Sequence, residues 1–142
     1  MPSQDRNLVE ALSEWVVKAE NDLKNAAHAL KLGRECPTDT VCFHAQQCVE
    51  KYIKALLVLK GIAFPKTHNI RVLLDLLRGE PAIDLESATQ NRLTDYATVS
   101  RYPGEEEPIT LAEARQAVRI ARRVRSEIRR MLPRAAWRRR SR

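Results

Sequence analysis

The chain reads VCFHAQQCVEKYIKALLVL from Val41 to Leu59, and this stretch decides the fold. Apolar side chains recur in it at steps of three and four, the periodicity of one helix face: Val41, Ala45, Cys48, Tyr52, Leu56 and Leu59. A second apolar stripe of Val49, Ile53 and Leu57 widens that face. We therefore predict a central, deeply buried helix that is capped by Thr38 or Asp39 and stopped by Gly61.

Four further helical segments lie between the clusters of Gly and Pro that punctuate the chain. The first carries an apolar stripe from Leu8 to Leu30 and is ended by Gly33. A short helix is expected from about Asn69 to Leu77. Another is expected from Leu85, capped by Asp84, to near Val99. The last opens with a capping box at Thr110-Leu111-Ala112-Glu113 and ends before Pro133.

No segment alternates apolar and polar residues over the length of a strand. The expected fold is therefore all-α, an up-and-down four-helix bundle with one additional short helix. The 142 residues match a single domain, which we expect to span residues 1–132. Residues 133–142 are expected to form a basic, disordered tail.

Several classes of protein are excluded by composition. No run approaches the ~20 apolar residues of a membrane span, so we expect no membrane association. The odd number of cysteines, Cys36, Cys42 and Cys48, favours reduced thiols in the cytoplasm. Cys42 and Cys48 would lie about 240° apart on a helix, so they do not converge on a metal. The glycines are too widely spaced for a phosphate-binding loop, and no metal or other cofactor is expected.

The net charge of +7 is unevenly distributed. Residues 111–142 hold twelve Arg against two Glu, whereas the first 110 residues carry a net charge of −3. An arginine block of this kind is typical of proteins that bind a polyanion, most often nucleic acid. The alternative is a solubilising helix face and tail with no partner.

The central helix also carries a polar stripe. Its members recur at steps of three and four, so we expect them on one face: His44, Gln47, Lys51 and Lys54. One interpretation is a binding surface. The other is structural: His44, Gln46 and Gln47 bond to neighbouring helices or loops, and Glu50 forms an (i, i+4) ion pair with Lys54.

The segment His44-Ala45-Gln46-Gln47-Cys48-Val49-Glu50-Lys51-Tyr52-Ile53-Lys54-Ala55-Leu56 resembles the signature helix of the HEPN family. Three other features are similar to that family. The first helix carries Trp15, Ala19, Asp22, Leu23, Ala26 and Leu30. Gly61 is followed by Pro65-Lys66-Thr67-His68-Asn69-Ile70, and Tyr96 is followed by Arg101-Tyr102-Pro103. The resemblance covers roughly residues 8–130.

This resemblance implies a helical bundle that often pairs as a homodimer. Many HEPN proteins are encoded beside a minimal nucleotidyltransferase, as the helical half of a toxin–antitoxin-like pair. Others bind RNA or nucleotides, or act as metal-independent endoribonucleases. The ribonuclease members use an Arg that is followed, after four to six residues, by a His.

The chain departs from the ribonuclease pattern. Arg101 matches the family's Arg, but no His follows it, because the last histidine is His68. His44 and His68 are the candidates to replace the missing imidazole. For His68 the other interpretation is a residue beside the cap of the following helix, without chemistry.

Arg101 and Tyr102 form a candidate pair for an anion and a base. Arg binds phosphate bidentately, and Tyr offers a ring face on which a base stacks. The alternative is that Arg101 only interacts with the exposed carbonyls at the end of a helix.

We therefore expect a HEPN-type binding module that recognises RNA or a nucleotide, forms a homodimer and works with a minimal nucleotidyltransferase. The expected binding residues are His44, Lys51, Lys54, His68, Arg101 and Tyr102. One alternative is a metal-independent endoribonuclease with a rearranged site built on Arg101 and His44 or His68. Another is an interaction protein whose basic helix binds an acidic protein.

Overall fold

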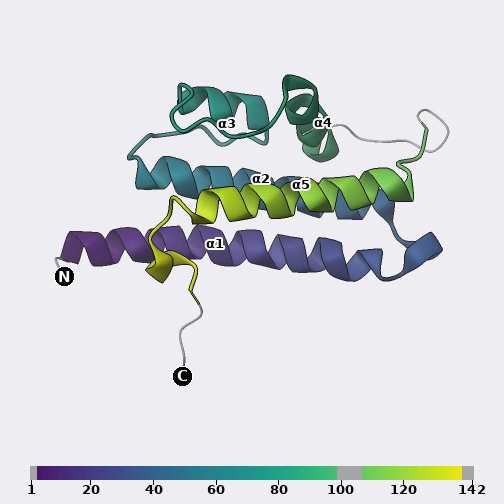
Figure 1. The fold of residues 1–142 in the computed structure, drawn as a ribbon, viewed down its shortest axis with the longest axis horizontal. Helices are drawn as coiled ribbons and strands as arrows, with labels where there is room; N and C mark the ends of the chain where they lie inside the picture. Colours follow the sequence, from purple (N-terminus) through teal and green to yellow (C-terminus); the bar gives the residue numbers. More distant parts are fainter. Residues whose placement is uncertain (1–2, 99–106, 139–142) are drawn as a thin grey trace.

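The structure, a computed structural model, describes residues 3–98 and 107–138 (Figure 1). These residues form helices and contain no strand, which confirms the predicted all-α class. The elements in chain order are α1 (Ser3–Leu30), η1 (Gly33–Glu35), α2 (Thr38–Leu59), α3 (Ile70–Leu76), α4 (Ser87–Thr98), α5 (Leu111–Arg129) and η2 (Arg134–Ala136), where η marks a 3-10 turn.

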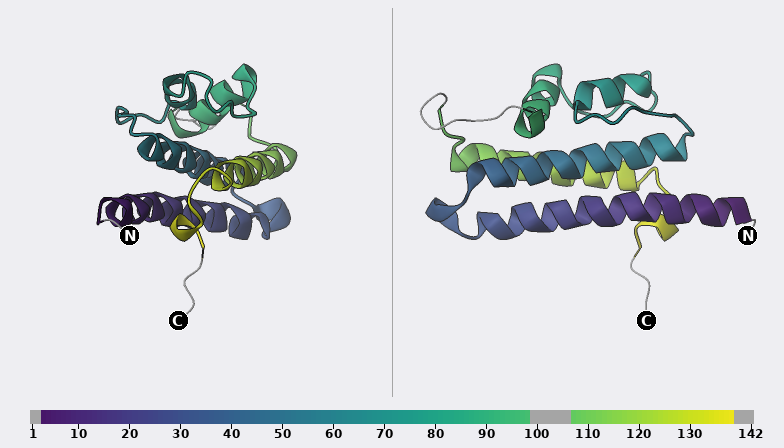
Figure 2. Two further views of the ribbon diagram at one scale, coloured as in Figure 1. Left: turned by 60° about the vertical axis from the view of Figure 1, so that its left-hand side comes forward. Right: turned by 180° about the vertical axis from the view of Figure 1, so that it is seen from behind.

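The helices form three layers. Figure 1 shows α1 on one side, α2 and α5 side by side in the middle, and α3 with α4 on the other side. The views in Figure 2 show the same layering. The chain runs one way along α1 and returns along α2, which is the predicted up-and-down course. After α2 the chain returns to the other end of the bundle by way of α3 and α4. Helix α5 then runs parallel to α2.

Helix α2 is the centre of the core, as predicted. Of its 22 residues, 14 are buried, and they include Tyr52, Ile53 and Leu56 at 0% exposure. Helix α1 contributes Leu12, and α5 contributes Ile128 from another side. Because other helices of the same chain cover α2, its burial needs no second copy.

Two of the predicted helix ends are confirmed. Gly61 lies beyond α2 with a φ of +69°, a conformation that glycine adopts without steric cost. The N–H of Gly61 donates to the Val58 carbonyl at 3.0 Å, and that of Ile62 donates to the Leu57 carbonyl at 2.9 Å. This pair of bonds is a Schellman motif. Thr110 caps α5, because its hydroxyl accepts from the Glu113 N–H at 3.0 Å.

Two other predicted caps are wrong. Pro37 occupies the N-cap position of α2, and Thr38 is already helical. The Thr38 hydroxyl donates instead to the Ile109 carbonyl at 2.7 Å, which ties the start of α2 to the segment before α5. The Asp39 carboxylate accepts from the adjacent Thr40 N–H, so it satisfies no amide further along the helix.

Asp84 does not cap α4, which begins at Ser87. The Asp84 N–H donates to the Glu127 carboxylate at 3.3 Å, and the Asp84 carbonyl accepts from Arg123 at 2.9 Å. Both bonds hold this residue against α5 and outside the helix. The predicted end of α4 near Val99 lies outside the described residues.

The segment after Pro133 differs from the predicted disordered tail in residues 134–138. These residues turn through η2 and lie back against α1 (Figure 1). Ala136 is 2% exposed, and the Trp137 indole N–H donates to the Arg129 carbonyl at 3.1 Å. Burial of small and aromatic side chains holds a segment that its charge alone led us to expect in solvent.

Candidate functional site

Asp22 of α1 joins two of the predicted binding residues. Its carboxylate accepts from His44 Nδ1 at 2.8 Å and from Lys51 Nζ at 2.5 Å. Both partners come from α2, where a step of seven residues returns to within about 20° of the same direction. Asp22 is 8% exposed, so the two bonds compensate the burial of its charge.

Glu50 of α2 joins two more of the predicted binding residues, Lys54 and His68. It accepts from Lys54 Nζ at 2.9 Å and from His68 Nδ1 at 2.9 Å. Gln46 braces this group, since its amide donates to Glu50 at 3.2 Å and to the His68 carbonyl at 2.9 Å. Gln47 donates in turn to Gln46 at 2.7 Å. The carboxylate of Glu50 therefore sits inside a network of bonds that fixes the loop before α3.

The predicted single polar face is thus divided into two carboxylate-centred groups. Lys54 lies about 80° around the helix from His44, which turns it away from Asp22 of α1 and toward the loop. The described contacts match the structural interpretation of the polar side chains of α2, in which they bond to neighbouring helices, to loops and to one another. His44 bonds to a neighbouring helix, Gln46 bonds to a loop, and Glu50 pairs with Lys54.

The four predicted binding residues in these two groups differ in how far their side chains are exposed to solvent. The Lys54 side chain is 9% exposed, and its ammonium lies 5.7 Å from the ring centroids of both Trp15 and Phe64. A macromolecular ligand cannot reach it there. Lys51 and His44 are 20% and 26% exposed, and His68 is 55% exposed. In each group the positive charge of the lysine is paired with the negative charge of the carboxylate.

The two imidazoles share one arrangement. In each, Nδ1 is bound to a carboxylate, Asp22 for His44 and Glu50 for His68. A carboxylate at Nδ1 fixes the orientation and tautomer of the ring and directs Nε2 elsewhere. Such an imidazole is suited to accept or deliver a proton at Nε2.

The other two predicted binding residues, Arg101 and Tyr102, lie outside the described residues. The neighbouring Tyr96 is described, and its hydroxyl donates to the Glu113 carboxylate at 2.5 Å. Burial and this hydrogen bond raise the pKa of Tyr96. Glu113 therefore does not complete the predicted capping box, because its carboxylate is used to fasten α4 to α5.

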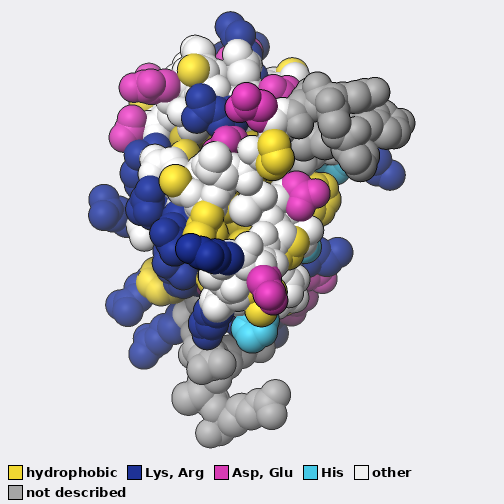
Figure 3. Space-filling model, turned by 90° about the vertical axis from the view of Figure 1, so that its right-hand side faces the viewer, with side chains coloured by type: hydrophobic (Ala, Val, Ile, Leu, Met, Phe, Trp, Pro, Cys, Tyr) yellow, Lys and Arg dark blue, Asp and Glu magenta, His cyan; other side chains and the backbone are white. Residues whose placement is uncertain are grey.

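The arginines of α5 form the main charged surface. At about 100° per residue, the seven arginines of this helix and its C-cap fall within about 160° of its circumference. Five of them are exposed and form what we call the arginine stripe: Arg115, Arg119, Arg122, Arg123 and Arg130. Figure 3 shows Lys and Arg gathered along one edge of the face seen from the end of the bundle. Among the described residues, no carboxylate pairs with the stripe.

The remaining two arginines of α5 turn inward to a carboxylate that the sequence did not single out. Glu20 of α1 accepts from Arg125 Nε at 2.7 Å, from Arg129 at 3.0 Å and from the Tyr52 hydroxyl at 2.5 Å. Burial opposes ionisation of Glu20, but the bonds from Arg125 and Tyr52 and the charge of Arg129 outweigh it, so its pKa is lowered. Its only signal in the sequence is a place beside the apolar stripe of α1.

The described residues offer neither a metal site nor a membrane span. Within residues 3–98 and 107–138, no three His, Cys, Asp or Glu side chains lie close enough to hold a metal ion. No helix in the same ranges is long and apolar enough to cross a bilayer. Burial raises the pKa of the Cys48 thiol, so this cysteine is not a reactive thiolate.

Three comparisons relate the chain to known proteins. The family model of the HEPN domain matches residues 12–131. "Putative toxin MJ1304" of Methanocaldococcus jannaschii is 46% identical over 50 residues, which are 35% of this chain and 31% of that protein's length. The crystal structure of ST0689, an archaeal HEPN homologue, matches with a TM-score of 0.63 and 27% identity. That match covers 84% of this chain and 96% of the homologue.

Proposed function

The chain belongs to the HEPN family, and we propose that it is a toxin-like binding module that recognises RNA or a nucleotide. The toxin-like role is supported by the relative of Methanocaldococcus jannaschii that is named as a toxin. The match spans about a third of that relative, so the role is inferred for the shared helical part.

The arginine stripe is the observation that carries the proposal. Five exposed guanidinium groups on one helix face have no acidic partner among the described residues. They are therefore available to phosphates, which arginine binds bidentately. The carboxylates of Asp22 and Glu50 are each paired with a lysine, so the stripe supplies the attraction. His44, Lys51, His68, Arg101 and Tyr102 remain proposed contacts, and Lys54 acts from its buried position by holding Glu50.

RNA binding measured by fluorescence anisotropy tests the proposal. We expect the Arg115→Gln, Arg119→Gln, Arg122→Gln triple variant to bind labelled single-stranded RNA more weakly. The slope of log affinity against log salt should flatten by about 2, which is roughly 0.7 for each phosphate that the variant no longer neutralises. The matched control removes three exposed charges elsewhere: Lys31→Gln, Arg34→Gln and Lys66→Gln.

The control triple variant should keep the slope of the unmodified protein. An equal weakening in the two triple variants would mean that net charge alone drives binding, and the stripe would not be a site. No RNA binding at low salt by the unmodified protein would refute the proposal itself.

The partners are inferred from family membership. We propose a homodimer that works in the cytoplasm with a minimal nucleotidyltransferase, as the helical half of a toxin–antitoxin-like pair. Light scattering should give a mass near twice the 16.3 kDa of one chain. A strict monomer at micromolar concentration would contradict the dimer, and co-expression with a neighbouring nucleotidyltransferase gene tests the heteromeric pair.

The second candidate function is a metal-independent endoribonuclease. It is favoured by the carboxylate–imidazole pairs at His44 and His68, which have the arrangement of a general base. The missing His after Arg101 argues against it, and we expect no cleavage of labelled RNA in EDTA. Cleavage that disappears in both Arg101→Ala and His68→Ala variants, and persists in Arg34→Ala, would establish the enzyme instead.

A further inference from the structure

Helix α5 turns its arginine stripe directly away from the bundle. At about 100° per residue, the centre of the stripe lies about 170° around the helix from the centre of the residues that α5 buries. Those buried residues are Ala114, Ala117, Val118, Ile120, Ala121, Val124 and Ile128. All five arginines of the stripe are exposed, so a ligand as large as a nucleic acid can lie along this side of α5.

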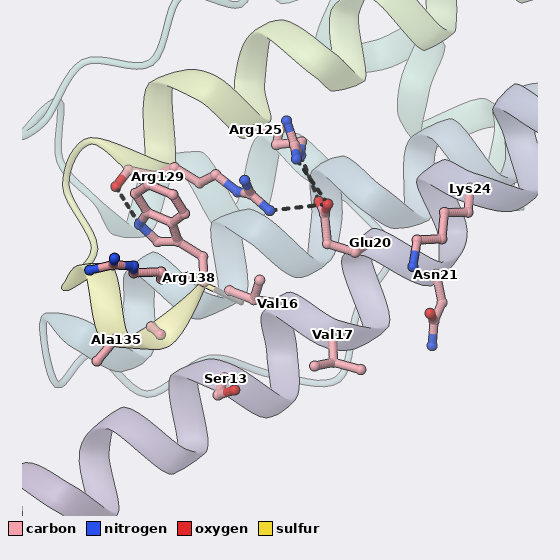
Figure 4. Close-up of a pocket in the computed structure, with 12 residues that line it drawn as sticks. Ser13, Val16, Val17, Glu20, Asn21, Lys24, Arg125, Arg129, Ala135 and Arg138 are labelled. Atoms are coloured by element: carbon pink, nitrogen blue, oxygen red, sulfur yellow. Dashed lines mark hydrogen bonds and ion pairs between the residues drawn. The ribbon is translucent and has the colours of Figure 1, made fainter. Parts of the chain in front are cut away.

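The other two arginines of α5 mark one border of that surface. Figure 4 shows Arg125 and Arg129 pointing to Glu20 of α1, with which they form ion pairs at 2.7 and 3.0 Å. Their side chains are 30% and 18% exposed. Because these two guanidinium groups serve the contact between α1 and α5, a ligand that lies along α5 meets the arginines of the stripe instead.

The stripe is made of two rows of arginines. Arg115 and Arg122 are seven residues apart, so they lie within about 20° of one direction and form the first row. Arg123 and Arg130 are also seven residues apart and form the second row, about 80° around the helix from the first. In each row the two residues are separated by about 10.5 Å along the helix axis. Long cationic side chains therefore project from both flanks of the exposed side.

Arg119 and Ser126 lie between the two rows. The Arg119 guanidinium donates to the side-chain oxygen of Gln116 through Nε at 3.0 Å and through Nη2 at 2.7 Å, which holds it along the helix. The Ser126 side chain is exposed and short. The middle of the stripe is therefore flatter than its two flanks.

The exposed side of α5 offers no ring on which a base could stack. The helix from Leu111 to Arg129 contains no Phe, Trp, Tyr or His. Tyr96 and Trp137 lie beside α5, but both are only partly exposed, and they bond to Glu113 and to the Arg129 carbonyl. Proteins that bind single-stranded nucleic acid combine a cationic groove with aromatic side chains that stack on the bases. The stripe has the cations without the rings.

On the basis of the RNA binding proposed above, on which this inference rests, we propose that the stripe binds double-stranded RNA. The minor groove of an A-form duplex is wide and shallow, and proteins recognise such a duplex through its shape, its phosphates and its 2′-hydroxyl groups. The first row of arginines contacts the phosphates of one strand, and the second row contacts those of the other. The flatter middle, with Ser126, faces the groove. The bases stay stacked inside the duplex, so recognition requires no aromatic side chain.

Fluorescence anisotropy with the full chain compares a labelled RNA duplex of about 16 base pairs with one of its strands alone. We expect the duplex to bind about tenfold more tightly at the same salt concentration, because its phosphates are already fixed in place and meet both rows. With the coefficient of duplex DNA, roughly 0.9 per phosphate, five arginines give a salt slope of about −4.5. A single strand that meets about three of them should give about −2. A second duplex of different sequence should bind equally well, because phosphate contacts carry no sequence information.

Two matched double variants test whether the duplex meets both rows. Arg115→Gln with Arg122→Gln removes the first row. Arg123→Gln with Arg130→Gln removes the second. Each variant should weaken binding of the duplex about tenfold and flatten its salt slope by about 2. A single strand has one row of phosphates, so at most one of the two variants should weaken its binding.

Lys31→Gln with Arg34→Gln is the control, since it removes the same charge from exposed positions outside α5 and should leave duplex binding unchanged. Three results would overturn duplex recognition. They are a single strand that binds as tightly as the duplex, a row variant without effect on the duplex, and equal weakening by the control. RNA is still bound in each case, so the proposed function would stand. If neither the duplex nor the strand binds, the proposed function fails, and duplex recognition fails with it.

Discussion

The side chain of Glu20 bonds to residues that lie far from it in the sequence. It receives Tyr52 from α2 and Arg125 and Arg129 from α5, and Arg125 is 105 residues away in sequence. The hydrogen bond to Glu20 raises the pKa of Arg125. Burial raises the pKa of Tyr52, and the hydrogen bond to Glu20 adds to that effect. One carboxylate thus holds three long helices at one level of the bundle.

Replacement of Glu20 by Gln should destabilise the protein in a pH-dependent manner. The pKa of Glu20 is lowered from 4.5 in the folded protein, so its ionised form contributes stability above the unfolded pKa. That contribution is lost as the pH falls through the folded pKa. We expect Glu20→Gln to lower the free energy of unfolding by about 2 kcal/mol at neutral pH, because two guanidinium groups are left without their partner.

Urea denaturation at pH about 7 and about 3 measures this effect. The difference between the unmodified protein and Glu20→Gln should shrink at the lower pH, because the carboxyl group of the unfolded chain is protonated below its pKa of 4.5 and the folded protein loses the advantage of its lowered pKa. Glu14→Gln is the matched control, since Glu14 is an exposed carboxylate on the same helix. A difference that stays constant with pH would show that Glu20 acts through packing and not through its charge.

For single residues, the sequence identifies which polar side chains share a helix face but not which residues they bond to. The spacing of His44 and Lys51 places them on one side of a helix, and the structure joins both to Asp22. Spacing rules act within a helix, whereas Asp22 lies 22 residues from His44 and on another helix. Partners across helices depend on how the helices pack, which no local pattern encodes.

The ends of the elements show where local sequence signals are strong and where they are overridden. Gly61 and Thr110 act as predicted, because a left-handed glycine and a capping hydroxyl satisfy nearby backbone groups. Thr38 and Asp84 were predicted from the same rules, but bonds to distant segments use their polar groups. A cap is thus predictable only where no tertiary partner competes for it.

Replacement of Gly61 by Ala should cost about 1 kcal/mol of unfolding free energy. A Cβ at this position meets nothing within 4 Å, so the cost comes from the φ of +69° and not from a clash. Gly61→Asn should be less destabilising, because Asn tolerates the left-handed conformation better than other residues. Chemical denaturation of the two variants measures the difference, and an equal effect of both would point to a steric cause instead.

At the scale of the whole molecule, the C-terminal segment packs against the first helix. Residues 134–138 lie against α1 near its N-terminal half and follow the C-terminal end of α5 (Figure 1). The sequence alone suggested a free basic tail, because four of the five residues from Arg134 to Arg138 are charged or small. The exception, Trp137, half-buries its ring over Arg129 and makes the segment part of the fold.

Truncation after Leu132 should therefore destabilise the whole bundle. It removes Ala136, which is 2% exposed, and the Trp137 ring with its bond to the Arg129 carbonyl. At ~25 cal/mol per Å² of apolar area, the destabilisation is about 2 kcal/mol once the ordering of the segment is subtracted. For a domain of this size that corresponds to a fall of roughly 4–8 °C in Tm.

The matched control is Arg134→Gln with Arg138→Gln, which removes the charges of the segment and keeps its packing. We expect its Tm to equal that of the unmodified protein, and a truncated chain that melts at the same temperature would mean that the segment only rests on the surface.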